Sequence, residues 1–545
     1  MSANQNYSKI GQLQTVRYIY LYAMIQRVLF AVLIIFLPLS DCLSQISGVD
    51  TLFKPSDLFY YSALERESFR QYFEGQPDYL KMILAVNANA SEQELASFSD
   101  WISDIALDIR QKKFDRLSAE KKIEQVERSL NADLLLSFEH QSSFSDLFSK
   151  GNYNYFTAAS VYALILDQVD IPNNIREVST GISILAYPDD EQITIEIDGP
   201  GSPFFKFAHD TRSNFVEFLR ESNAVDDATF AMVNSRSLFE RYYFADYGLS
   251  IREMIGMQYL KSAIDYLKKS EPANAYTQFE KAFILYPCHK IQYLLMTQLN
   301  SFLTAMDYYK LQDLGYLINA SRLIGFGMDR EMITSYLQDI VRQVLTEKQD
   351  LKGMQYIFDY LQEYLADEAL KKDFSFRFYY ETGRLHFIDG QYRKALASSE
   401  TAYSLKPDDE NNQNLLVGSL GGYTINSNPG MVLEKINLYD TAYIGIVDNE
   451  IYLTIKQHAC LEFFGEAFQL QDSKNGELYM ALFEDMVDQH PDIIINSLAI
   501  GRSYSSAAIY YYRQGHVQKS REIVEKGLKY APHNLELKLK LKSFE

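Results

Sequence analysis

Three segments in the carboxy-terminal half of the chain share one register, which ends at Pro287, Pro407 or Pro532. At fixed distances before each proline stand one tyrosine and three small residues. In chain order these are Tyr259, Ala263, Ala275 and Ala282, then Tyr379, Gly383, Ala395 and Ala402, then Tyr504, Ala508, Ser520 and Gly527. Small residues let two helices approach closely, and a proline cannot continue a helix. The register therefore predicts helical hairpins that stack on one another.

These units, residues 256–289, 376–409 and 501–534, resemble the tetratricopeptide repeat. Gly390 and Gly515 stand at the predicted turn, where a positive φ is needed. The family's leucine position is degenerate, with Ser262, Thr382 or Ala507 in its place. The resemblance implies an all-α solenoid over residues 216–545, whose groove holds a protein or peptide partner.

The stretches between these units do not keep the register. Residues 301–372 and 456–491 show apolar residues at helical spacing, which predicts helices. Residues 426–449 open with a cluster of turn residues, so we expect an interruption of the stack there.

Residues 46–215 have a mixed pattern that predicts a separate α+β domain. Helical patterns cover 95–109, 123–136 and 157–169. Residues 182–186 and the alternation at 193–197 predict two strands, joined by a turn at Asp189 and Asp190.

This domain resembles the transglutaminase-like, papain-type superfamily, in the bacterial subgroup with helical repeats downstream. The matching residues are Asn154, Ala159, Tyr162, Ile171 and Pro172 around the buried helix, and Ala186, Tyr187, Pro188 and Glu196 in the hairpin. The resemblance implies a catalytic cysteine at the start of that helix, a histidine on the next strand and an acid on the second.

Each of these catalytic positions departs from the family pattern. Tyr155 stands at the cysteine position, Gly181 at the histidine position and Asp198 near the acid position. Cysteine catalysis needs a thiolate and a nearby base, and no cysteine occurs in residues 46–287. We interpret the nearby His140 and His209 as surface or cap residues. The domain is therefore predicted to be a pseudoenzyme.

Two interpretations of the degenerate cleft stay open. It could bind a peptide or glycan between Tyr153, Tyr155 and the loop at 199–203, or Tyr155 could simply fill the space of the lost side chains.

The charge and the cysteine content argue against several other classes of function. The formal net charge is −20, which would repel nucleic acid. The three cysteines, Cys42, Cys288 and Cys460, form neither a disulfide framework nor a metal-ligand set. Phosphate-binding, dinucleotide and hydrolase motifs are also missing, so we expect no cofactor and no metal.

Residues 1–45 are predicted to be a signal peptide or a membrane anchor. The apolar run at 28–39 is shorter than a membrane span and suits a secretory signal, with cleavage before Gln45 and a start at Met1 or Met24. Alternatives are an uncut anchor, a lipid on Cys42, or a cytosolic chain. We expect export to the periplasm or cell envelope.

These observations favour a non-catalytic cell-envelope scaffold that holds a protein partner. The alternatives are a cysteine-independent hydrolase or lyase acting on a peptide or glycan through the amino-terminal cleft, and a head with a purely structural role. The oligomeric state is not set by the sequence.

Overall fold

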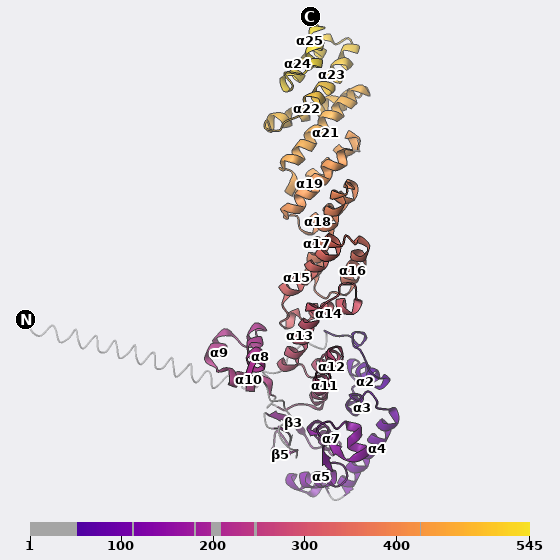
Figure 1. Cartoon of the computed structure of the whole chain (residues 1–545), viewed down its shortest axis with the longest axis vertical. Helices are drawn as coiled ribbons and strands as arrows, with labels where there is room; N and C mark the ends of the chain where they lie inside the picture. The colour runs from indigo at the N-terminus through magenta and orange to yellow at the C-terminus, as the bar shows by residue number, and fades with distance from the viewer. Residues whose placement is uncertain are drawn as a thin grey trace, which may run out of the picture. The chain divides into compact units, whose positions relative to one another are not determined.

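A computed structural model describes residues 52–111, 114–178, 181–197, 209–244, 248–425 and 427–544. The described part is mainly helical with a small sheet region, which is compatible with a helical solenoid (Figure 1). The chain divides into two compact units, residues 1–301 and 302–545. The predicted signal or anchor at 1–45, Asp198 and the loop at 199–203 lie outside the described residues.

The first unit combines helices with two small sheets. Its helices before the larger sheet are α2 (Ala63–Phe73), α3 (Tyr79–Ala85), α4 (Glu92–Gln111), α5 (Ala119–Asp133), α6 (Phe144–Lys150) and α7 (Tyr155–Gln168). Those after it are α8 (His209–Glu221), α9 (Asp227–Met232), α10 (Ser235–Tyr243), α11 (Ile251–Lys268), α12 (Pro272–Leu285) and α13 (His289–Thr304). A short parallel pair, β1 (Ser137–Phe138) and β2 (Asn152–Tyr153), leads directly into α7.

The larger sheet is an antiparallel meander of β3 (Asn173–Val178), β4 (Gly181–Ala186) and β5 (Ile193–Glu196). Strands β4 and β5 confirm the two predicted strands, whereas β3 was not predicted. Apolar side chains pair across the sheet, with Ile184 opposite both Ile175 and Ile195. Helix α7 is buried along most of its length and packs against β3, β4, α4 and α11. It is therefore the central element of the first unit.

Two buried ion pairs join the first repeat-like hairpin, α11–α12, and the helix after it, α13, to the amino-terminal elements. Lys281 Nζ on α12 lies 2.6 Å from Glu65 Oε1 on α2, and both side chains are at most 2% exposed. Lys290 on α13 pairs with Glu177 on β3, also at most 2% exposed. Hairpin α11–α12 thus packs with the head. This is why the structural division, at 301/302, differs from the boundary that the sequence suggested at 215/216.

The second unit is helical throughout its described residues. Its helices are α14 (Leu311–Arg322), α15 (Arg330–Val341), α16 (Leu351–Tyr364), α17 (Glu368–Ile388), α18 (Tyr392–Leu405), α19 (Glu410–Thr424), α20 (Pro429–Ala442), α21 (Glu450–Gln469), α22 (Ser473–Gln489), α23 (Ser497–Arg513), α24 (Val517–Tyr530) and α25 (Leu535–Lys542). One turn of π-helix, Arg342–Glu347, follows α15.

Helices α17–α18, α21–α22 and α23–α24 form closely packed hairpins (Figure 1). Each first helix also contacts the next: α17 with α19, α19 with α21, α21 with α23, and α23 with α25. Where an interruption was expected, at 426–449, helix α20 forms and packs against α21, but it approaches α19 much less closely than the helices of the other hairpins approach each other. Asn428 caps α20 and Pro429 occupies its first position, so the predicted turn residues start a helix.

The repeat-defining residues lie where hairpin helices approach each other. The positions of Ala275, Ala395 and Ser520 are fully buried, as are those of Ala282 and Ala402. Each second helix ends two residues before its proline, at Leu285, Leu405 or Tyr530. The tyrosine position differs between the units. Tyr259 and Tyr504 are fully buried, whereas Tyr379 is half-buried and its neighbour Phe378 is the buried aromatic residue of that hairpin.

Four hairpins share one turn geometry. The second residue after the first helix has a positive φ, and the next residue donates its backbone N–H to the carbonyl five residues earlier. The positive-φ residues are Ser270 (61°), Gly390 (70°), Gln471 (65°) and Gly515 (80°), and the donors are Glu271, Gln391, Asp472 and His516. Glycine was predicted to adopt a positive φ at 390 and 515, and the structure confirms both. Hairpin α21–α22 was not recognised as a repeat unit from the sequence, because its turn uses Gln471 in place of glycine and its second helix is longer.

Substitutions at the turns are expected to shift stability in opposite directions. Left-handed backbone costs a non-glycine residue roughly 1 kcal/mol. Ser270→Gly should therefore stabilise the protein by about that amount, and Gly515→Ala should destabilise it similarly. A Cβ at Gly515 would meet nothing within 4 Å, so backbone strain alone is tested. Urea unfolding monitored by circular dichroism measures both changes. A loss of stability in Ser270→Gly would contradict the account of the shared turn.

Buried tyrosines connect neighbouring helices through carboxylates that also bind lysine. Tyr504 donates to Glu484 over 3.1 Å, and Lys526 binds the same carboxylate over 2.9 Å. Comparable groups are Tyr259–Glu65–Lys281, Tyr439–Glu400–Lys435, Tyr452–Asp440–Lys456 and Tyr511–Glu477–Lys519. The abundant tyrosines therefore pack their rings inside and bond their hydroxyls across helices.

Stability is expected to fall steeply above about pH 10. Burial, and then the adjacent carboxylate, raise the pKa of Tyr259 and Tyr504 above the ordinary value of about 10. In that window the unfolded chain loses phenolic protons that the folded chain keeps, so rising pH favours unfolding by about 1.4 kcal/mol per pH unit for each such tyrosine. Urea midpoints measured from pH 8 to 11, with tyrosinate absorbance, test this. Equal midpoints at pH 8 and 11 would contradict it.

Among the described residues no helix is both long enough and apolar enough to cross a membrane.

Candidate functional site

The start of α7 is built around Asn154. Its side-chain oxygen accepts the backbone N–H groups of Phe156 (2.9 Å) and Thr157 (3.0 Å), and its amide donates to the carbonyl of Ser142 over 2.6 Å. These bonds fix the first turn of the helix against the loop before α6. Tyr155 follows directly, so its side chain has a defined position.

Tyr155 is a buried packing residue rather than an exposed nucleophile. It is 4% exposed, and its ring packs against Phe138 with centroids 4.9 Å apart at an angle of 66°. Burial raises the pKa of its phenol above 10, so the group stays protonated at neutral pH. Of the other degenerate positions, Gly181 begins β4, opposite Val178 of β3. His140 is exposed, and His209 begins α8.

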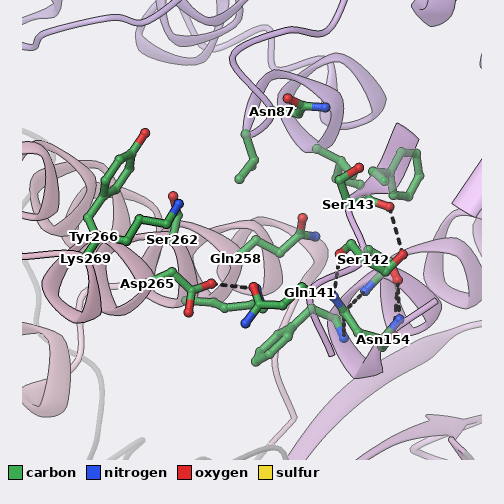
Figure 2. A pocket seen from close by; sticks show the side chains of 16 residues that line it. Asn87, Gln141, Ser142, Ser143, Asn154, Gln258, Ser262, Asp265, Tyr266 and Lys269 are labelled. Carbon is green, nitrogen blue, oxygen red and sulfur yellow. Dashed lines mark hydrogen bonds and ion pairs between the residues drawn. The ribbon is translucent and has the colours of Figure 1, made fainter. Parts of the chain in front are cut away.

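A polar pocket of about 230 Å³ lies beside the same helix start (Figure 2). It is lined by Asn154, Phe156 and Thr157, not by Tyr153 or Tyr155. The pocket therefore opens on a different side of α7 from the cleft that the sequence suggested. Its remaining lining comes from α3, from the residues around the start of α6 and from α11: Ile83, Val86, Asn87, Gln141, Ser142, Ser143, Phe144, Gln258, Lys261, Ser262, Asp265, Tyr266 and Lys269.

Helix α11 and the residue that follows it supply the charged groups of this pocket. Lys261 Nζ lies 2.8 Å from Asp265 Oδ2, one helical turn away, and Lys268 lies 3.2 Å from Asp265 Oδ1. Burial acts to raise the pKa of Asp265, but the two lysines more than offset it, so its pKa is lowered and the group is a carboxylate. The pocket thus holds a fixed donor and acceptor side by side.

A second pocket, of about 410 Å³, lies in the second unit. The end of α19, the start of α20 and one face of α21 enclose it. It combines apolar and polar side chains: Gly421, Thr424, Ile425, Ser427, Pro429, Val432, Thr454, Ile455, His458, Ala459 and Glu462. Ile425 at its edge is 71% exposed. A pocket of this size and composition suits a side chain or short segment of another molecule.

The two described cysteines are poorly suited to chemistry. Cys288 and Cys460 are free and at most 2% exposed, and burial raises the pKa of each thiol to about 12. Within the described ranges, no three His, Cys, Asp or Glu side chains lie close enough together to bind a metal ion.

No protein-family model matches the chain, and no curated protein sequence is significantly similar to it.

The polar face of α11 was missed at the sequence level, because the helix was considered only as part of a repeat. A usable signal exists. Gln258, Lys261, Ser262, Asp265 and Lys269 recur at helical spacing within an otherwise apolar segment. A polar stripe on a helix that is otherwise buried indicates that this side of the helix faces either solvent or a polar cavity.

Proposed function

We propose that the chain is a non-catalytic binding or scaffold protein of the cell envelope, in which a tetratricopeptide-type solenoid holds a protein partner. The observation that carries this proposal is the pocket on α21 within the stacked hairpins. Stacked helical hairpins expose extended surfaces that bind segments of other proteins. The exposed Ile425 and the polar Thr454 and His458 give this surface both apolar and hydrogen-bonding groups.

The head is proposed to be a degenerate transglutaminase-like domain that has lost its chemistry. A buried helix followed by antiparallel strands supports this relation. The burial of Tyr155 and the raised pKa of its phenol support the loss of a nucleophile at that position. Asn154 then serves as a helix cap.

The envelope location is proposed from residues 28–39, whose apolar run suits an export signal or anchor. Affinity capture of the full chain from envelope fractions tests the proposal. We expect one partner in stoichiometric amount, recovered also with Tyr155→Phe because no reaction at the phenol is needed. Repeated recovery of the chain alone, or a turnover of envelope peptide or glycan that Tyr155→Phe abolishes, would contradict it.

A further inference from the structure

The pocket of the first unit has two chemically different walls. Ile83 of α3 and Val86 directly after it, with Phe144 and Phe156, form an apolar side. The face of α11 forms a polar side, and Figure 2 shows Gln258, Ser262 and Asp265 along that helix, across from Asn87, Ser143 and Asn154. A ligand that fits must carry hydrogen-bonding groups on one face and C–H groups on the other.

Lys261 and Asp265 of the pocket are paired with each other. A charged ligand would have to compete with that ion pair, whereas a neutral ligand can bond to both partners. A neutral vicinal diol suits the pair, because one hydroxyl can donate to the carboxylate while its neighbour accepts from the ammonium group. Both partners are partly buried, at 24% and 19% exposure, so solvent screens such bonds only in part.

Gln258 provides an unused acceptor in the same wall. Its side chain is nine-tenths buried, and its amide nitrogen donates to Ser160 Oγ over 2.7 Å. That bond fixes the orientation of the amide, and Oε1 accepts no hydrogen bond from the described residues. Ser262, one turn along the helix, adds a hydroxyl that can donate or accept. Gln258 Oε1 is not among the fully buried unpaired atoms of the described residues, so it is open to the pocket and can accept from a ligand hydroxyl.

We propose that this pocket binds one neutral sugar residue, with a vicinal diol on Lys261 and Asp265, another hydroxyl on Gln258, and the C–H face of the ring against Phe156. A pyranose ring offers both the hydrogen-bonding hydroxyls and the C–H face that the two walls of the pocket require. The volume of about 230 Å³ lies below the roughly 300–1,000 Å³ of pockets for drug-sized ligands, so it suits a single ring. This site is separate from the proposed partner pocket on α21.

Saturation-transfer NMR and calorimetry on the full chain test the proposal. The probes are methyl pyranosides of glucose, galactose, mannose and N-acetylglucosamine, with tetrahydropyran-2-methanol as a ring without a vicinal diol and N-acetylalanine amide as a peptide. At least one pyranoside should bind saturably with a dissociation constant in the millimolar range or below. Asp265→Asn should weaken that binding by about tenfold or more.

Two variants on α11 separate a binding effect from a folding effect. Ser262→Trp fills the pocket and should abolish sugar binding, whereas Leu267→Trp, on the exposed side of the same helix, should leave it unchanged. Both should keep the thermal midpoint within a few degrees of the parent. The proposal is overturned if no pyranoside saturates, if Ser262→Trp binds as well as Leu267→Trp, or if N-acetylalanine amide binds as tightly as the best sugar.

Discussion

Replacing Lys281 by methionine is expected to destabilise the first unit by about 3–5 kcal/mol. The substitution leaves the buried Glu65 carboxyl group without the ammonium group that lies 2.6 Å from it. Lys281 is also surrounded by tyrosine rings, with Tyr61 centred 4.9 Å from Nζ. Burial lowers the pKa of Lys281, and Glu65 acts in the opposite direction.

The two buried cysteines allow this effect to be assigned to one unit. Cys288 lies in the first unit and Cys460 in the second, and each reacts with a thiol reagent only when its surroundings open. In Lys281→Met we expect Cys288 to be labelled about 100-fold faster or more, with Cys460 unchanged, as measured by mass spectrometry of the labelled peptides. Lys150→Met, which removes a surface pair with Asp146, should shift neither rate by more than a few fold. Equal acceleration at both cysteines would contradict the division into two units.

Replacing Lys290 by methionine is expected to have an effect of the same size. Lys290 Nζ lies 2.6 Å from Glu177 Oε2, and this pair joins α13 to β3. The single substitution leaves a buried carboxylate in the sheet. The double variant Glu177→Leu/Lys290→Met should recover most of the loss, because apolar side chains often replace a buried ion pair without cost.

A double-mutant cycle on the free energy of unfolding measures this coupling. We expect a coupling energy of at least about 2 kcal/mol between Glu177 and Lys290. If the two single substitutions were simply additive, this ion pair would not be what joins α13 to the sheet.

The sequence was most informative where a residue acts on its own backbone. Gly390 and Gly515 need a positive φ and Pro407 cannot continue a helix, so the turns and ends of two hairpins could be located. The turn at Gln471 could not, because a polar residue enters the left-handed region there without a local signal. Strand β3 was missed because Asn173–Val178 lacks regular alternation, and pairing with β4 stabilises it.

Features that depend on distant partners could not be predicted. Glu65 and Lys281, like Glu177 and Lys290, are far apart in the sequence, and nothing local shows that a charged residue will be buried. The boundary near residue 301 reflects the packing of α11 against α3, α7 and β3, which also links segments far apart in the sequence. The position of Tyr155 at the start of α7 was predictable, but its packing against Phe138 and the pocket on the other side of the helix required the structure.

The most direct test of the proposed function compares two substitutions on α21. Thr454 lines the 410 Å³ pocket and is exposed, whereas Ile451, exposed on the same helix, does not line it. Tryptophan at 454 should fill the pocket, and tryptophan at 451 is the matched control. The amount of partner captured per chain from envelope fractions, by quantitative mass spectrometry, should fall at least tenfold for Thr454→Trp and stay at the parent level for Ile451→Trp. Equal recovery with both variants would contradict the claim that this pocket of the solenoid holds the partner.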